Sequence, residues 1–272
     1  MHIKIPFSFS LSKIAASGQC FRVRIFDDGT YRFVTGGHVL YIRQTGEKDF
    51  DVSCKKIEWR EIWSPYFDLE RNYEAVRKRI KKKDTFLQRA CLEGAGIRIL
   101  RQEHFETLIS FIISQRKSIP AIQGCVEMIC ERFGRRLSTA EEEIYLFPTA
   151  EELAHATIDD LLACRVGYRA KYIYETARSV AQKPGILTAM ESLDDEALYA
   201  ALTEFSGVGV KVANCVSLFS YGRTSRVPID TWIQKMIDTR FNGTNRFLEF
   251  RDDAGILQQY IFYYALQHKE EF

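Results

Sequence analysis

The stretch that decides the fold of this chain is Leu202-Thr-Glu-Phe-Ser-Gly-Val-Gly-Val-Lys-Val-Ala-Asn-Cys215. Its pattern predicts one helix ending at Ser206, a turn over Gly207-Val208-Gly209, and a second helix that carries Cys215. Two glycines around one residue allow positive φ and leave backbone N–H groups uncovered. Because the positive end of the second helix dipole faces the same turn, the motif favours binding of a DNA phosphate.

A lysine stands just inside the second predicted helix. The dipole disfavours a cation at Lys211, and this favours the neutral amine that a nucleophile requires. Cys215 follows four residues later and shares its helix face. Val227-Pro-Ile-Asp230 adds a carboxylate downstream. Alone, the turn would indicate an ordinary helix connection and Lys211 a solvated lysine, but hairpin, lysine, proline and aspartate in this order favour a catalytic site.

The composition limits the classes of protein to which this chain can belong. At 272 residues, with 46% hydrophobic and 27% charged residues, the chain can bury one large core or two smaller ones. A net charge of +2 means that nucleic-acid binding must come from local patches. No apolar run reaches membrane-spanning length, so we expect no membrane association. Seven scattered cysteines indicate reduced thiols in a cytoplasm, and the histidines lack metal-ligand spacing. We expect no metal and no cofactor.

The hydrophobic periodicity changes once along the chain. Residues 1 to about 65 predict an antiparallel meander, with a strand over Cys20–Phe26 that places Phe21, Val23 and Ile25 on one face, and a hairpin turn at Asp27-Asp28-Gly29. From about residue 70 the pattern is helical, and Thr149-x-x-Glu152 and Thr157-x-x-Asp160 are helix-capping patterns. We therefore predict an α+β fold, with a β-rich domain over 1–88 and a mostly α-helical region over 89–272.

Two further pairs suit recognition of a nucleic-acid base. Tyr168 and Arg169 open a helix and combine a flat aromatic ring with a fork of donors, which could fill the gap left by an extruded base. Gln258 and Phe262 are four residues apart on one helical face, where an amide can read a base edge and a ring can stack on it. Either pair alone would indicate ordinary packing at a helix start and in a core.

Several motifs together resemble the 8-oxoguanine DNA glycosylases of the helix-hairpin-helix superfamily, bacterial type. Beyond the hairpin, the resemblance lies in five segments: Ala16-Ser-Gly-Gln-Cys-Phe-Arg22, Tyr66-Phe-Asp-Leu69, Gly96-Ile-Arg-Ile-Leu-Arg-Gln102, Gly167-Tyr-Arg-Ala-Lys-Tyr172 and Ala254-Gly-Ile-Leu-Gln-Gln-Tyr-Ile-Phe262. It implies a bifunctional enzyme of base excision repair that removes 8-oxoguanine from double-stranded DNA and cleaves the resulting abasic site by β-elimination. It also implies a monomer in the cytoplasm, associated with the nucleoid of a prokaryote.

The resemblance implies roles for single residues. Lys211 attacks C1′ and forms a Schiff base, while Asp230 stabilises positive charge on the sugar. The flipped base lies between Cys215 and Phe262, with Gln258 on its Watson–Crick edge. The carbonyl of Gly18 accepts a hydrogen bond from N7–H, a proton that 8-oxoguanine has and guanine lacks. A buried carbonyl left unsatisfied would cost about 1–3 kcal/mol.

The loop expected to fill the gap that the flipped base leaves in the DNA duplex departs from the family pattern. Gly207, Gly209, Tyr168 and Arg169 are expected to contact DNA, together with Gln115 and Arg116 of the loop Ile113-Ser-Gln-Arg-Lys-Ser-Ile-Pro-Ala-Ile122. Arg116 replaces an asparagine that contacts the estranged base, and Ala121 stands where the mammalian enzymes have a second arginine. Trp232 replaces a histidine, which is expected to alter contacts near the 5′ phosphate. The preference for the opposite base is therefore open.

Two other functions remain open at this point. The chain could be a helix-hairpin-helix glycosylase for another damaged base, such as an alkylated base or an oxidised pyrimidine; Gly18, Gln258 and Phe262 argue against it. It could also be a hairpin module that binds DNA without chemistry, against which Lys211 and Asp230 argue together.

Overall fold

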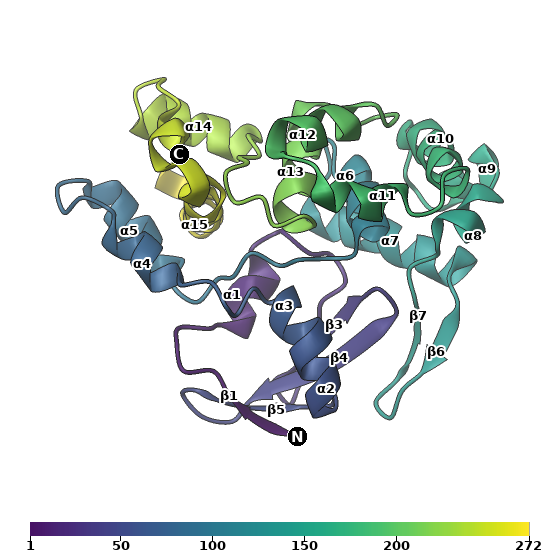
Figure 1. Ribbon diagram of the computed structural model, residues 1–272, viewed down its shortest axis with the longest axis horizontal. Coiled ribbons are helices and arrows are strands. Elements are labelled where there is room, and N and C mark those ends of the chain that lie inside the picture. The colour runs from purple at the N-terminus through teal and green to yellow at the C-terminus, as the bar shows by residue number, and fades with distance from the viewer. Residues whose placement is uncertain (272) are drawn as a thin grey trace. The chain divides into compact units, whose positions relative to one another are not determined.

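The computed structural model describes residues 1–271 and contains two compact units (Figure 1). The first unit combines Met1–Phe33, Leu40–Arg101 and the chain from Gly222 onward; the second combines Val34–Val39 with Gln102–Tyr221. The predicted α+β class, with an N-terminal antiparallel sheet and a mostly helical remainder, is confirmed.

The sheet has five strands in the order β1-β5-β4-β3-β2. Their bounds are β1 (His2–Lys4), β2 (Arg24–Ile25), β3 (Thr30–Thr35), β4 (His38–Gln44) and β5 (Asp49–Val52). The strands from β2 to β5 form the predicted meander, and β1 adds to β5 with Ile3 opposite Phe50. Between β2 and β3, the predicted Asp28-Gly29 hairpin is confirmed by a hydrogen bond from Phe26 N to Thr30 O of 2.9 Å.

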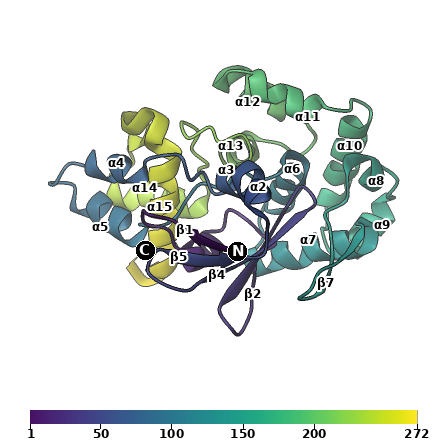
Figure 2. The same cartoon turned by 60° about the horizontal axis from the view of Figure 1, so that its bottom comes forward.

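Two expectations for this region are wrong. The strand expected over Cys20–Phe26 contains only Arg24–Ile25, at the sheet edge visible in Figure 2, and Ile25 is 58% exposed. Phe21 and Cys20 are buried ahead of the strand, because the chain there packs as a loop and does not alternate across a sheet. Residues before 65 are also not all β-rich, since a helix occupies Leu11–Ala16 and helical structure resumes at Lys56.

Helices complete the first unit around an aromatic core. They are α1 (Leu11–Ala16), α2 (Lys56–Glu58), η1 (Trp59–Trp63), α3 (Ser64–Tyr66), α4 (Tyr73–Lys78), α5 (Thr85–Glu93), α14 (Thr231–Arg240), η3 (Arg246–Asp253), α15 (Ala254–Gln267) and η4 (Lys269–Glu271). Phe33, Phe50, Trp63 and Phe67 have no exposed surface; the Phe33 and Phe67 rings meet edge to face, and the Trp63 ring lies tilted at 35° to that of Phe67. Burial of these rings stabilises the unit that holds α15.

The second unit is a bundle of helices with one short hairpin. Its elements are α6 (His104–Ile113), α7 (Ile119–Phe133), β6 (Arg136–Ser138), β7 (Glu143–Tyr145), α8 (Ala150–Ala154), α9 (Ile158–Ala163), α10 (Arg169–Ala181), α11 (Ile186–Ala189), η2 (Met190–Ser192), α12 (Asp195–Thr203) and α13 (Val210–Phe219). Both predicted capping patterns are confirmed as reciprocal capping boxes, at Thr149 and at Thr157. The hairpin β6–β7 was not predicted, because three-residue polar strands leave no readable alternation.

The seven cysteines are all free and buried. Burial raises the pKa of Cys91 to about 12 and that of Cys54 to about 11, so both thiols are neutral at physiological pH. Within residues 1–271, no helix combines the length and the apolar character that crossing a lipid bilayer requires.

Candidate active site

The hairpin turn joins α12 to α13, and its two glycines differ. Gly207 has φ +77°, and a Cβ added there would lie 2.6 Å from Cγ of Tyr172. Gly209 has an ordinary φ of −97° as the N-cap of α13, and a Cβ there would meet nothing within 4 Å. The expectation that both glycines adopt positive φ is therefore wrong for Gly209. Its exposed backbone instead faces open space at the positive end of α13, as binding of a phosphate requires.

Lys211 is the second residue of α13 and is half-buried. Its Nζ donates a hydrogen bond to Oγ of Ser114 over 3.1 Å and lies 5.1 Å from the ring centroid of Phe111. The Ser114 hydroxyl itself donates to the carbonyl of Phe111 at 2.7 Å, so its lone pairs face the amine. Among described residues of its own unit, no carboxylate forms an ion pair with Lys211. A neutral hydroxyl thus orients the amine without an anion that would stabilise its charge.

The loop after α6 is bonded to the hairpin turn. Nε2 of Gln115 donates to the carbonyls of Ile112, at 3.0 Å, and of Gly207, at 3.1 Å. The next residue, Arg116, is exposed and has φ +51°, a conformation that costs a residue with a Cβ roughly 1–2 kcal/mol. The structure therefore joins Gln115 to the hairpin turn, with the exposed Arg116 next to it in the chain.

The Tyr168–Arg169 pair differs from the expected tip. Tyr168 is 56% exposed, but Arg169 is only 5% exposed, with its Cζ 4.3 Å from the Tyr168 ring centroid. Its guanidinium donates to the carbonyl of Gln115 and, over 3.1 Å, to that of Val166. The expectation of a displayed donor fork is wrong for the free protein, because nearby backbone carbonyls already engage the fork.

Asp230 and Trp232 lie at the start of α14 in the first unit. Asp230 is the N-cap, and its side chain accepts a hydrogen bond from Ile233 N at 2.9 Å. Trp232 is half-buried, and Nζ of Lys235 lies 5.0 Å from its ring centroid. The cap therefore fixes the carboxylate at the N-terminus of α14.

The predicted base-recognition residues of the first unit are Gly18, Gln258 and Phe262. Gly18 follows α1 with φ +72°, and among residues 1–271 its carbonyl accepts no hydrogen bond. Gln258 is 3% exposed, and its Oε1 has no hydrogen-bond partner within the same residues. Phe262 lies one turn further along α15 and is half-buried. The Gly18 carbonyl oxygen and Oε1 of Gln258 are therefore two free acceptors in the described part of the chain, and the N–H groups of a bound base could donate to them.

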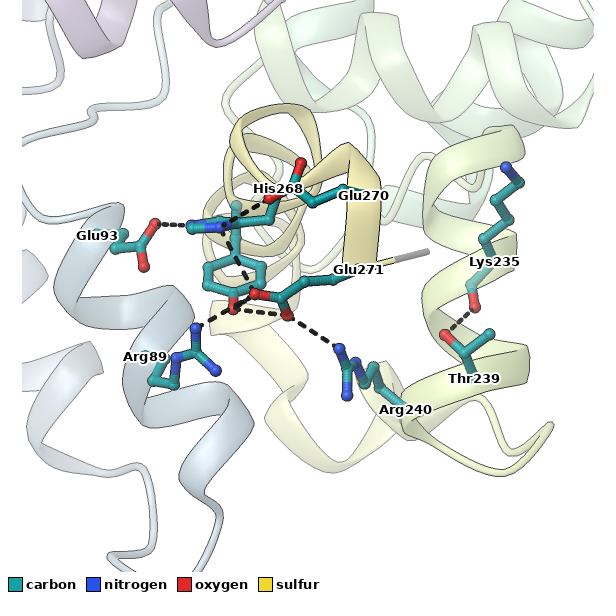
Figure 3. A network of polar contacts seen from close by, with 9 residues as sticks. Arg89, Glu93, Lys235, Thr239, Arg240, His268, Glu270 and Glu271 are labelled. Atoms are coloured by element: carbon teal, nitrogen blue, oxygen red, sulfur yellow. Dashed lines mark hydrogen bonds and ion pairs between the residues drawn. The ribbon is translucent and has the colours of Figure 1, made fainter.

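A polar network fastens the end of α15 to its neighbours (Figure 3). Nε2 of His268 lies 2.7 Å from Oε2 of Glu93 on α5. Glu271 binds Arg240 of α14 at 3.0 Å and Arg89 of α5 at 3.4 Å. The network therefore holds α14, which begins at Asp230, against the helix that carries Gln258 and Phe262.

The second unit holds Cys215, which is 2% exposed on α13 and in line with Lys211 as predicted. Sequence reasoning gave no role to Ser114 and Phe111, which contact Lys211, or to Gln259, which bonds the Ser17 carbonyl beside Gly18. These contacts join residues far apart in the sequence, so no local pattern indicates them. In the described part of the chain, no group of three or more His, Cys, Asp or Glu side chains is arranged to hold a metal ion.

Comparison with known proteins identifies the class. Residues 109–246 match the model of the HhH-GPD superfamily of base excision DNA repair proteins, and the chain belongs to that family. Residues 2–108 match the N-terminal domain of 8-oxoguanine DNA glycosylases, which places the chain on that branch. The resemblance inferred from the sequence motifs is confirmed.

Individual relatives agree with this assignment. The N-glycosylase/DNA lyase of Saccharomyces cerevisiae is 39% identical over 159 residues, which are 54% of this chain and 42% of the yeast protein. The probable N-glycosylase/DNA lyase of Methanothermobacter thermautotrophicus is 29% identical over 255 residues, 85% of this chain and 79% of that protein. The chain thus spans less than half of the yeast protein's length.

The fold also resembles that of solved structures. The 8-oxoguanine glycosylase/lyase of Clostridium acetobutylicum, in complex with duplex DNA containing cytosine opposite 8-oxoguanine, is 33% identical with a TM-score of 0.89, over 99% of this chain and 98% of that one. A 3-methyladenine DNA glycosylase from Archaeoglobus fulgidus is 21% identical with a TM-score of 0.76, a likeness of fold alone.

Proposed function

We propose that this chain is a bifunctional DNA glycosylase that excises 8-oxoguanine from duplex DNA and cleaves the abasic product as a lyase. The observation that carries the proposal is the setting of Lys211: its amine lies at the start of the hairpin's second helix, bonded to Ser114 and to no carboxylate of its own unit. A structural lysine would gain little there, whereas a nucleophile needs an oriented amine with an accessible lone pair.

The chemistry follows from the amine and one carboxylate. Lys211 attacks C1′ as the bond from C1′ to the base breaks, and the base leaves with the bonding electrons. The nitrogen then gives up one proton, and its lone pair forms the C1′=N double bond as the C1′–O4′ bond breaks and O4′ takes up a proton, which opens the sugar ring and produces the protonated Schiff base. Loss of a proton from C2′ breaks the C3′–O bond by β-elimination. Asp230 stabilises the positive charge that develops on the sugar, and its N-cap bond to Ile233 fixes the orientation of the carboxylate.

Lesion recognition is assigned to the unbonded acceptors of the first unit. The Gly18 carbonyl accepts the N7–H of 8-oxoguanine, while Oε1 of Gln258 accepts from a donor on the Watson–Crick edge. Phe262 supplies one stacking face, and Cys215 the other. Guanine would leave the Gly18 carbonyl facing a lone pair at N7, at a cost of about 1–3 kcal/mol for the unsatisfied group.

The partner is double-stranded DNA that contains oxidised guanine. We propose that the exposed Gly209 backbone contacts its phosphates, and that Gln115, Arg116 and Tyr168 occupy the space the flipped base leaves. We further propose that the protein acts as a monomer in the cytoplasm without membrane contact.

Borohydride trapping tests the proposal. The wild-type protein should form a covalent adduct with a duplex containing 8-oxoguanine, and Lys211→Gln should not. A panel of duplexes with 3-methyladenine or an oxidised pyrimidine tests the alternative lesions. Efficient excision of one of those bases without excision of 8-oxoguanine would refute the proposed substrate.

A further inference from the structure

Two buried glutamines fix the turn at Gly18. Nε2 of Gln259, on α15, donates to the carbonyl of Ser17. Nε2 of Gln19 donates to Oγ of Ser17 at 2.8 Å and to the carbonyl of Arg98 at 2.9 Å. Oε1 of Gln19 accepts from Leu100 N at 2.8 Å. Ser17, Gln19 and Gln259 are at most 1% exposed, so these bonds form away from competing water.

The residue between these anchors is left unbonded. The Ser17 hydroxyl donates to the carbonyl of Ile14 at 2.7 Å, so that Ser17 is saturated by hydrogen bonds. Gly18, by contrast, has positive φ and a carbonyl without a donor among residues 1–271. A glycine in this conformation has no side chain to set its orientation, so its neighbours decide where its carbonyl points.

Gln259 and Gln258 are consecutive on α15, so their side chains diverge by about 100° around the helix axis. Gln258 belongs to the predicted base pocket, while Gln259 reaches the Ser17 backbone. We propose that Gln259 is a positioning residue for lesion specificity: it ties the peptide next to Gly18 to the helix that carries Gln258 and Phe262. This inference rests on the proposed function.

The hydrogen bond from Gln259 to the Ser17 carbonyl would fix the orientation of the neighbouring Gly18 carbonyl. A hydrogen bond from the Gly18 carbonyl to N7–H discriminates only if the carbonyl is held at one distance and angle from the base. Without Gln259 the Ser17 carbonyl would be buried and unsatisfied, and the peptide would rotate to find another donor. That rotation would carry the adjoining Gly18 carbonyl away from N7, while Lys211 and Asp230 would keep their own contacts.

The experiment compares two reactions of the same protein. Single-turnover excision of 8-oxoguanine requires the base pocket, whereas cleavage of a preformed abasic site requires the amine but no base. Gln259→Met removes the donor at nearly constant volume, and Gln259→Glu keeps the shape but turns an acceptor towards the Ser17 carbonyl. Gln259→Asn, a milder change, keeps the amide on a side chain one methylene shorter. Gln267→Met is the matched control, because Gln267 is exposed on the same helix.

We expect the ratio of 8-oxoguanine excision to abasic-site cleavage to fall about tenfold in Gln259→Met, and further in Gln259→Glu. Gln259→Asn should lie between wild type and Gln259→Met, and Gln267→Met should match wild type. If the Gln259 variants were only destabilised, both reactions would slow alike and the ratio of excision to abasic-site cleavage would stay at the wild-type value. A wild-type ratio in all three Gln259 variants would therefore overturn the inference. Failure of the wild-type protein to excise 8-oxoguanine would instead refute the proposed function.

Discussion

The two glycines of the hairpin turn should respond to alanine in opposite ways. An alanine at position 207 would have to adopt φ near +77°. Its Cβ would also lie 2.6–2.7 Å from Cγ, Cβ and Cδ2 of Tyr172. The left-handed conformation costs roughly 1–2 kcal/mol, and overpacking roughly 1–3 kcal/mol more. Gly207→Ala should therefore lower the free energy of unfolding by roughly 2–5 kcal/mol, since neither Cβ nor Cγ of Tyr172 is the free end of a flexible chain.

At Gly209 the same substitution meets no atom within 4 Å and an allowed φ of −97°. Stability should stay unchanged or rise by up to about 1 kcal/mol, because alanine restricts the unfolded chain. The methyl group would, however, occupy the space from which a phosphate approaches the α13 N-terminus. We expect the affinity for a duplex with a stable abasic-site analogue to fall about tenfold.

The assay pairs urea denaturation with DNA titration for each variant. Gly207→Ala should shift the unfolding midpoint, while Gly209→Ala should change DNA binding only. Two results would refute the reasoning: a Gly207→Ala variant within about 1 kcal/mol of wild type, or a Gly209→Ala variant with wild-type affinity for DNA. The first would mean that Tyr172 moves at little cost, and the second that the phosphate does not approach this turn.

Three further predictions concern the chemistry and the partner base. Lys211→Gln should abolish base removal and borohydride trapping but keep binding to damaged DNA; normal excision would remove this amine from the mechanism. Asp230→Asn should keep the fold, because asparagine also caps helices, yet slow single-turnover cleavage of the glycosidic bond roughly a hundred-fold or more; a near-native rate would leave Asp230 only a capping role. Excision of 8-oxoguanine should be only modestly faster when the opposite base is cytosine than when it is thymine, guanine or adenine. The reason is that Ala121 offers no donor and Arg169 is bonded to backbone carbonyls. Ala121→Arg should strengthen the preference for cytosine. A wild-type preference for cytosine of about a hundred-fold, near 3 kcal/mol, would show that Arg116 or Arg169 reads the base alone.

Local features of this protein could be predicted from the sequence alone. The hairpin at Asp28-Gly29, the capping boxes at Thr149 and Thr157, and the placement of Lys211 just inside α13 all depend on residues within a few positions of each other. Backbone preferences and short-range hydrogen bonds act within such windows, so the order of residues specifies them. The family motifs also predicted the α+β fold class, which the structure confirms.

Tertiary structure decided which groups are free and which are bonded. The Lys211–Ser114 hydrogen bond spans 97 residues, and the Gln259–Ser17 bond spans 242, so no local pattern encodes either. The same holds for Arg169, which is buried and has one terminal guanidinium nitrogen bonded to the Gln115 carbonyl 54 residues away. A buried polar group must find a partner wherever the packed chain brings one, and that choice is fixed only once the helices and loops have assembled.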